Sequence, residues 1–285
     1  MRYAVKVAYD GSLFHGSQRQ SDPDPGSVEG AIVRALEEIG GRKDGEWPVE
    51  FSSRTDSGVS AIGNVFAMET ERDVNDLLKA LNANMDGVWC WGAGPLREHQ
   101  NIRWANSRWY RYHLPPGILD EEGVKGLNLV ARELIGEHDF THFCRLEEEK
   151  DPVTVVEKAS VIDLARDGEM VVFDVVGNRF LWQQVRRMVG GCLAVSRGDI
   201  SIDDLRALLK GRDAPESSLA MKNRIKTMPG TGLFLMDARF DDVEFKIAWD
   251  ALELAIARTS ESVWGASMKV LLNSAMRSLM SLKGR

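Results

Sequence analysis

Apolar residues recur with two different periods along the chain, and the periods predict where strands and helices lie. In residues 2–10, Tyr3, Val5 and Val7 alternate with Ala4 and Lys6, which is typical of a strand. Helical spacing predicts helices after Ser27 and Asp73, residue types that can accept hydrogen bonds from a first helical turn. The other predicted strands of this half are 49–53, 62–69, 88–91 and 108–114. The first half therefore reads β-α-β-β-α-β-β.

A similar order follows Pro115-Pro116-Gly117, which is typical of a linker. The pattern predicts helices over 121–135, over 180–195 and from Ser201 to Gly211, a hairpin of 153–165 with 169–176 around Asp167-Gly168, and a last strand over 233–240. Two halves of similar order favour an α+β fold in which two related units share one sheet. The predicted division is 1–115, 116–240 and a C-terminal extension, 241–285. In that extension an apolar helical stripe from Trp264 to Leu279 indicates either a helix docked on the body or a dimer contact.

Composition and charge exclude several classes of protein. The 44% apolar and 28% charged residues exclude a disordered chain, and no apolar stretch is long enough to span a membrane. The net charge of −7 gives no general affinity for nucleic acid, so any such function must come from local clusters. Three well-separated cysteines, Cys90, Cys144 and Cys192, and the lack of a leader indicate an intracellular, cytoplasmic setting.

The motifs leave few ways to carry chemistry. HExxH, GxSxG, Walker A and GxGxxG are all absent, so nothing indicates a nucleotide cofactor or a serine hydrolase. His138, His142 and Cys144 could suggest a metal site, but they follow the predicted helix end at Gly136. The loop 54–58 follows a predicted strand, so Asp56 lies at a strand end, where functional sites are often built. The alternative is that Asp56 only shapes a turn before Gly58.

Two basic clusters point toward RNA. The first has Arg97, Arg103, Arg108 and Arg111 interleaved with Trp104, Trp109, Tyr110 and Tyr112, a mixture that suits phosphates and stacked bases, although a sheet with one solvated face is the alternative. The second has Arg179, Arg186, Arg187 and Arg197, without an acid from 177 to 198. Arg186 lies at the edge of a predicted core stripe, where a partly buried arginine needs a carboxylate such as Asp56; otherwise it is an ordinary surface residue.

Seven motif blocks follow one another from residue 9 to about 240. The blocks are Tyr9-Asp10-Gly11-Ser12-x-Phe14-x-Gly16-Ser17-Gln18-Arg19-Gln20, Arg54-Thr55-Asp56-Ser57-Gly58-Val59, Asn82-Ala83-Asn84, Arg108-x-Tyr110-Arg111-Tyr112, Gly136-x-His138-Asp139-Phe140-Thr141-x-Phe143, Phe180-x4-Val185-Arg186-x2-Val189-Gly190 and Gly232-Leu233-Phe234-Leu235. In this order they resemble the TruA family of tRNA pseudouridine synthases. This sequence departs from the family's usual Trp at Ser17, its usual His at Ser60 and its usual Phe-His-Ala-Arg block at residues 99–103. The extension after 240 lies beyond the usual family end.

The resemblance implies an isomerase that converts uridine to pseudouridine in the anticodon stem-loop of tRNA, near positions 38–40, without a cofactor or metal. It implies two α+β halves on a mixed or antiparallel central sheet, with helices on one side and a cleft between the halves, and a homodimer that binds tRNA. Asp56 would be the essential carboxylate, Arg186 its ion-pair partner, Tyr110 the ring that stacks on the target base, and Arg54 the side chain that intrudes where the uridine leaves the stack. RNA contacts are expected from Arg19, Arg103, Arg108, Arg111, Arg179 and Arg187. The alternatives are a catalytically silent tRNA-binding or folding module of the same fold, and a small-molecule enzyme with Asp56 as general base.

Overall fold

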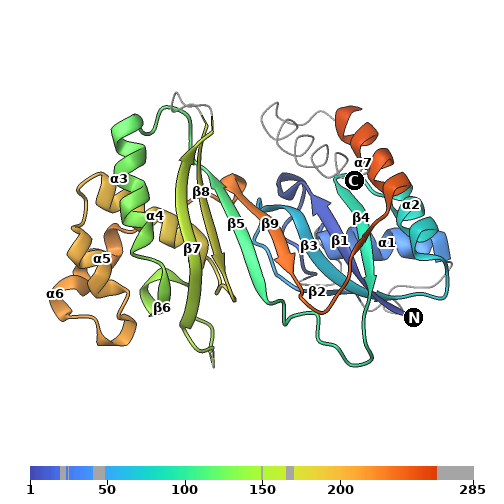
Figure 1. Cartoon of the computed structure of the whole chain (residues 1–285), viewed down its shortest axis with the longest axis horizontal. Helices are drawn as coiled ribbons and strands as arrows, with labels where there is room; N and C mark the ends of the chain where they lie inside the picture. Colours follow the sequence, from blue (N-terminus) through green and yellow to red (C-terminus); the bar gives the residue numbers. More distant parts are fainter. Residues whose placement is uncertain (20–23, 25, 41–48, 149, 165–169, 262–285) are drawn as a thin grey trace. The chain divides into compact units, whose positions relative to one another are not determined.

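The computed structural model describes residues 1–19, 24, 26–40, 49–148, 150–164 and 170–261. Contacts within the chain define two compact units, one of residues 1–105 with those from 237 onward, the other of residues 106–236 (Figure 1). Each unit combines antiparallel strands with helices, so the predicted α+β class is confirmed. None of the helices in the described ranges is long and apolar enough to cross a membrane.

The sheet of the first unit is built around β1 (Arg2–Tyr9). This strand pairs antiparallel with β3 (Ser60–Glu69) on one side and with β4 (Val88–Pro95) on the other. Two short strands pair antiparallel with these: β2 (Glu50–Phe51) with β3, and β10 (Lys246–Ile247) with β4. The β1–β3 register shifts between Val7 and Tyr9, which is where the strand meets the first predicted motif block.

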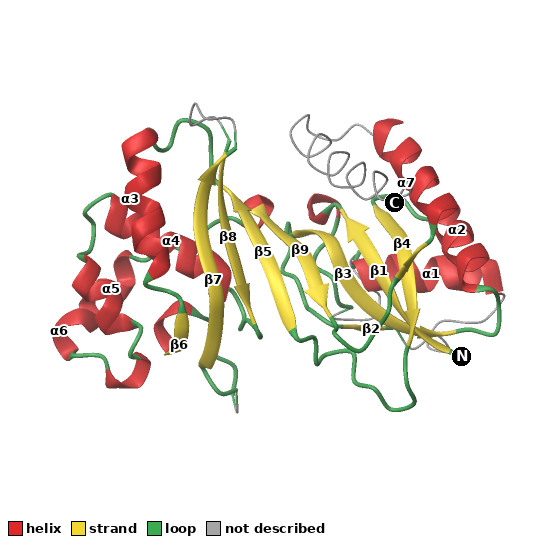
Figure 2. Ribbon diagram, in the orientation of Figure 1, coloured by secondary structure: helices red, strands yellow, loops and turns green. Residues whose placement is uncertain are grey.

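Three helices of this unit, α1 (Val28–Gly40), α2 (Val74–Asn84) and α7 (Trp249–Glu261), pack together and against β4 (Figure 2). The predicted caps are confirmed, because Ser27 Oγ accepts from the amide of Gly30 and Asp73 accepts from two amides of α2. The buried amide of Asn82 joins three elements: it donates to the carbonyls of Cys90 and Ala251 and accepts from the amide of Cys90.

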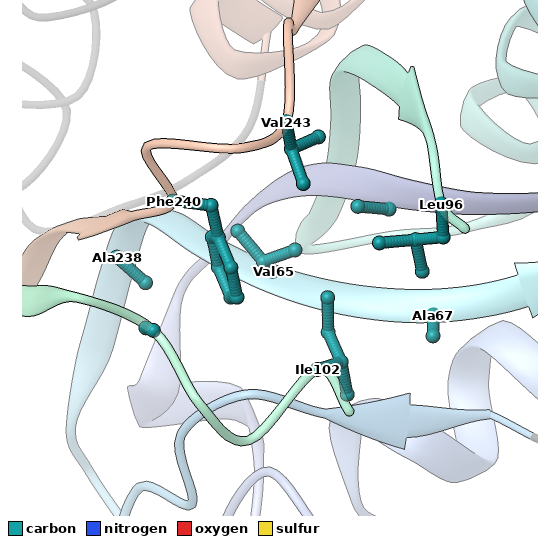
Figure 3. Packing of buried hydrophobic residues seen from close by; sticks show 9 residues of the cluster. Val65, Ala67, Leu96, Ile102, Ala238, Phe240 and Val243 are labelled. Carbon is teal, nitrogen blue, oxygen red and sulfur yellow. The ribbon is translucent and has the colours of Figure 1, made fainter. Parts of the chain in front are cut away.

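An apolar cluster forms where β1 and β3 meet the loop 96–105 and the chain after residue 237 (Figure 3). Ile102 and Leu96 point from the loop toward Val65 and Ala67, and Phe240 and Val243 close the cluster. At its edge, buried Lys6 donates to the Asp237 carboxylate and to the carbonyl of Ala238. Burial lowers the pKa of Lys6, and Asp237 opposes that shift.

The second unit has the strand order β5 (Ser107–His113), β8 (Val171–Gly177), β7 (Val153–Asp163) and β6 (Gly136–Asp139), all antiparallel. Helix α3 (Glu121–Arg132) packs on β7 and on α4 (Gln184–Ser196). Two shorter helices, α5 (Ile202–Leu208) and α6 (Glu216–Leu219), follow, and α5 begins with the capping box of Ser201 and Asp204. The chain leaves this unit along β9 (Leu233–Arg239).

Several boundaries differ from the sequence prediction. The predicted division is at residue 115, but β5 belongs to the second unit because it pairs with β8. Residues 241–261, predicted as a separate extension, pack with the first unit. Helix α4 begins at Gln184, not at 180, because Gln183 has a left-handed backbone with φ of 63°. The hairpin tip at Asp167-Gly168 and the stripe from Trp264 to Leu279 lie outside the described residues.

Candidate active site

The loop that carries Asp56 lies between β2 and β3 and is bound to the chain segment that follows β1. Thr55 donates its amide to Ser17 Oγ (2.8 Å), and Ser17 donates its amide to the carbonyl of Thr55 (3.1 Å). Gly11 and Gly16 permit this approach: a Cβ on Gly11 would lie 2.1 Å from the carbonyl oxygen of Val59, and Gly16 adopts a φ of +118°. Two motif blocks that are far apart in sequence therefore form one structural unit.

A buried network of side chains holds the loop from beneath. Tyr9 shares a hydrogen bond with Thr55 Oγ1 (2.8 Å), and Asn64 donates to the Tyr9 hydroxyl (3.0 Å) and to the carbonyl of Ser53 (2.9 Å). Asn64 Oδ1 accepts from Ser52 and from the amide of Val65. All of these side chains are buried, so the loop backbone is positioned by groups that solvent does not reach.

Asp56 itself is half-buried at the turn that this network supports. Its carbonyl accepts from the amide of Val59 (3.1 Å), and Gly58 supplies the positive φ of 81° that the turn requires. The neighbouring Thr55 is buried, whereas Arg54 and Ser57 are exposed. Asp56 therefore shapes a turn, and its half-buried carboxylate on a rigid support also suits chemistry on a bound substrate.

Removing the centre of this network is expected to reduce stability. For Asn64→Ala we expect a loss of about 2–4 kcal/mol in the free energy of unfolding, because Tyr9 and several backbone groups lose buried partners. Urea denaturation checks this value. The control Asn84→Ala removes an exposed amide from α2 and should change stability by less than about 1 kcal/mol. An Asn64→Ala protein as stable as wild type would show that the network does not support the loop.

The other predicted residues of the first unit surround the start of α1 and β2. Glu29 accepts from the amide of Arg19 (3.0 Å), and its pKa is raised by burial while Arg19 and Arg54 oppose the shift. Arg19 and Arg54 are thus brought near one carboxylate. Arg103 lies on the loop 96–105 and forms an ion pair with Glu50 (3.1 Å).

In the second unit, side chains alternate between the two faces of β5. Arg108, Tyr110 and Tyr112 are buried, while Trp109, Arg111 and His113 on the other face are half-buried. The Tyr110 ring makes an edge contact with Phe180, with ring centres 5.3 Å apart. Arg108 donates to the carbonyl of Asn178 (2.6 Å) and is only 8% exposed, which leaves little of its guanidinium for a phosphate.

On the opposite face of β5, Arg111 makes a two-point ion pair with Asp174 (2.8 and 2.7 Å), which also accepts from the Trp109 indole. Asp174, on β8, had no motif to mark it, because only the β5–β8 register places it opposite Arg111. This pair neutralises much of the Arg111 charge. Arg111 is therefore a weaker phosphate ligand than the sequence alone suggests.

His113, on the same face, makes stability depend on pH. Burial, aided by the Arg111 charge, lowers the pKa of His113 to about 4. The unfolded chain takes up this proton near pH 6.5 and the folded chain does not, so stability should fall between pH 6.5 and 4 by up to about 1.4 kcal/mol per pH unit. Urea denaturation at pH 7 and pH 5 should show that the free energy of unfolding falls less for His113→Phe than for wild type. An equal fall in both proteins would contradict His113 as the cause of the pH dependence.

Helix α4 carries the two adjacent arginines. Arg186 is half-buried and donates from Nε to the carbonyl of Met228 (2.6 Å), and its charge also acts on the Tyr112 hydroxyl. Gly190 permits the close packing behind this contact, since a Cβ there would lie 1.9 Å from the carbonyl oxygen of Lys226. Arg187 donates to the carbonyl of His142 (3.2 Å), and Arg179 binds the backbone and carboxylate of Asp151. Each of these cations is held by the second unit's own backbone.

The residues considered for a metal have other partners. His138 and His142 lie within hydrogen-bonding distance of the carbonyls of Ile135 and Gly211. Burial raises the pKa of the Cys144 thiol to about 11, which disfavours the thiolate that a metal would need. In the part of the chain that the structure describes, no three His, Cys, Asp or Glu residues are grouped so as to hold a metal ion.

Comparison with known proteins identifies the family. A family model described as tRNA pseudouridine synthase (PseudoU_synth_1) matches residues 130–241. The chain is 35% identical over 253 residues to tRNA pseudouridine synthase A of Pyrococcus furiosus, covering 87% of this chain and 86% of that protein. It is 36% identical over 256 residues to the Pyrococcus horikoshii protein of the same name (89% and 90% covered), and 33% identical over 257 residues to that of Thermococcus sibiricus (89% and 90%).

These matches define an RNA-modifying isomerase. The chain belongs to the TruA family of tRNA pseudouridine synthases, and it isomerises uridine to pseudouridine in tRNA. The resemblance carried by the motif blocks is thereby confirmed. Among solved structures, the chain is similar to a Cbf5–Nop10–Gar1 complex at 12% identity and a TM-score of 0.35, covering 90% of this chain and 67% of that chain, too weak a likeness to inform the site.

Proposed function

We propose that this enzyme acts through Asp56, with Arg186 as the cation that pairs with its carboxylate and Tyr110 as the ring on which the target uracil stacks. The observation that carries the proposal is the support of the Asp56 turn by buried Tyr9, Thr55 and Asn64, which fixes one carboxylate on a rigid base. The reaction needs a carboxylate in a fixed position, because that carboxylate must be held accurately against the nucleoside while the uracil turns.

The reaction breaks the bond between N1 of uracil and C1′ of ribose, turns the base, and forms a bond between C5 and C1′. The C5 proton is then lost and N1 gains a proton, so atoms and electrons balance without a redox partner. An ionised Asp56 fits both routes considered, covalent addition to the nucleoside and abstraction of the C2′ proton. The apolar face of Tyr110, backed by Phe180, provides a planar surface for the detached uracil.

The target nucleotide must leave the RNA stack, which costs a few kcal/mol. We propose that phosphate contacts from Arg19, Arg103, Arg179 and Arg187 offset that cost, with smaller contributions from the internally paired Arg108 and Arg111. Arg54 is exposed beside Asp56, which supports its role at the position that the uridine vacates. The expected substrate region is the anticodon stem-loop at positions 38–40, and the expected acting species is a homodimer in the cytoplasm that needs no cofactor.

Release of tritium from tRNA labelled at uridine C5 tests the proposal, because C5 loses its proton only when the new bond forms. Release by wild type and none by Asp56→Ala supports an active enzyme with this site. Full release by Asp56→Ala overturns the assignment of Asp56. Tight tRNA binding by wild type without any release would favour the silent binding module instead.

A further inference from the structure

An exposed tryptophan lies at the start of the helix that carries Arg186. Trp182 is 39% exposed, although an indole ring is among the largest apolar surfaces a side chain can present. The guanidinium of Arg145 lies over this ring, 4.2 Å from its centre, and the Arg145 amide donates to the carbonyl of Trp182 (2.9 Å). Nothing in the proposed isomerisation uses either side chain.

The turn that presents Trp182 is rigid and strained. Gln183 has a φ of 63°, an uncommon conformation for a residue other than glycine. Buried Gln184 stabilises the turn on both sides: its Oε1 accepts from the amide of Leu181 (2.8 Å), and its Nε2 donates to Thr154 (2.8 Å). Strain of this kind persists where surrounding contacts enforce it, and it is found at binding and catalytic sites.

The charges around Trp182 differ between its two sides, so the ring is the feature that a ligand would contact. No acid occurs from 177 to 198, and Arg187 of the next helical turn is bound to His142, close in the chain to Arg145. Glu147 and Glu148 follow Arg145 and are exposed, so phosphates are disfavoured on that side and the ring is the attractive feature. A nucleobase stacks on an indole irrespective of its identity.

We propose that Trp182 and Arg145 form a stacking site for an unpaired tRNA nucleotide other than the target uridine. The inference rests on tRNA being the substrate, and it assigns a binding contact rather than a step in the reaction. Because Trp182 lies in the turn directly before α4, a base held there would lie near the start of the helix that carries Arg186. The occupant is a base of tRNA, since the acids beside Arg145 oppose a purely phosphate ligand.

The test measures the dissociation constant for an unmodified tRNA transcript and the single-turnover isomerisation rate at saturating tRNA. Trp182→Ala should weaken binding about 5- to 150-fold, the equivalent of one stacked base, and should leave the saturated rate within about twofold of wild type. Trp182→Phe should retain most of the affinity, whereas Trp182→Leu, which keeps apolar volume without an aromatic face, should not. Circular dichroism and thermal denaturation confirm that each variant is folded.

Two exposed residues of α3 provide matched controls: Leu129→Ala removes an apolar side chain and Arg132→Ala removes a charge. Both should bind tRNA as wild type does. The loss of tRNA affinity for Trp182→Ala should be the same at low and high salt, because stacking is not electrostatic. The loss of tRNA affinity for Arg145→Ala should become smaller as the salt concentration rises. Wild-type affinity of Trp182→Ala, or a loss equal to that of Leu129→Ala, overturns the proposal. Because affinity is measured apart from turnover, an inactive wild type would contradict the Asp56 assignment and leave this result intact.

Discussion

Asp56→Asn is expected to lower the single-turnover rate of tritium release by at least about 10⁴-fold while tRNA affinity changes little. The amide keeps the size of the carboxylate and the turn to Val59, but it cannot act as a nucleophile or as a base. The loop should stay in place, because Tyr9, Ser17 and Asn64 support it through Thr55 and Ser53. Rapid-quench measurements at saturating tRNA report the rate directly.

Two further variants at this turn separate chemistry from structure. Asp56→Glu keeps the charge but moves it by one methylene, and a displacement of about 1 Å costs on the order of 100-fold in a positioned reaction. Ser57→Ala is the control, since Ser57 is exposed and its hydroxyl makes only a long contact (3.4 Å) to the carbonyl of Phe14. A rate for Asp56→Asn within tenfold of Ser57→Ala would show that Asp56 is part of a turn and nothing more.

Arg186→Met is expected to lower the saturated rate by about 10²- to 10³-fold, the second largest effect. Methionine keeps much of the stem that packs at the edge of α4 but removes the cation proposed to hold Asp56 ionised and oriented. Arg186→Lys should recover part of the loss, because it restores the charge without the planar guanidinium. The hydrogen bond to Met228 is lost in the methionine variant, so its thermal stability is measured as well.

Arg187→Met is the matched control on the same helix. Arg187 is bound to the carbonyl of His142 and is proposed to contact RNA, so its loss should raise the dissociation constant and leave the saturated rate near wild type. The two adjacent arginines are therefore expected to affect different quantities, Arg186 the saturated rate and Arg187 the dissociation constant. If both variants changed only affinity, Arg186 would be an RNA ligand rather than the partner of Asp56.

The sequence predicted the elements whose signals are local. The residue types at 27 and 73 located two helix caps, and Ser201 marked where a third helix begins. The start of α4 was misplaced because apolar spacing runs back through Phe180. The left-handed turn at Gln183 depends instead on the Gln184 side chain, which accepts from the Leu181 amide and donates to Thr154 of β7. Strand β6 was not predicted, since its four residues gain their conformation from pairing with β7.

The candidate site was predicted only in part, for a similar reason. Motif blocks led to the proposal of Asp56, Tyr110 and Arg186 by resemblance, but the supporting roles of Ser17 and Asn64 depend on contacts between distant segments. Asp174 is another example, because only strand register reveals that it pairs with Arg111. Periodicity finds which face is buried; it does not find which polar groups meet there.

Mapping pseudouridine in a single unmodified tRNA after incubation with wild-type or Asp56→Asn protein tests the central claim most directly. Mass spectrometry of nuclease fragments locates each modified position. The account predicts pseudouridine within positions 38–40 for wild type and unmodified uridine there for Asp56→Asn at equal tRNA occupancy. Pseudouridine formed at those positions by Asp56→Asn at a rate near that of wild type would contradict it.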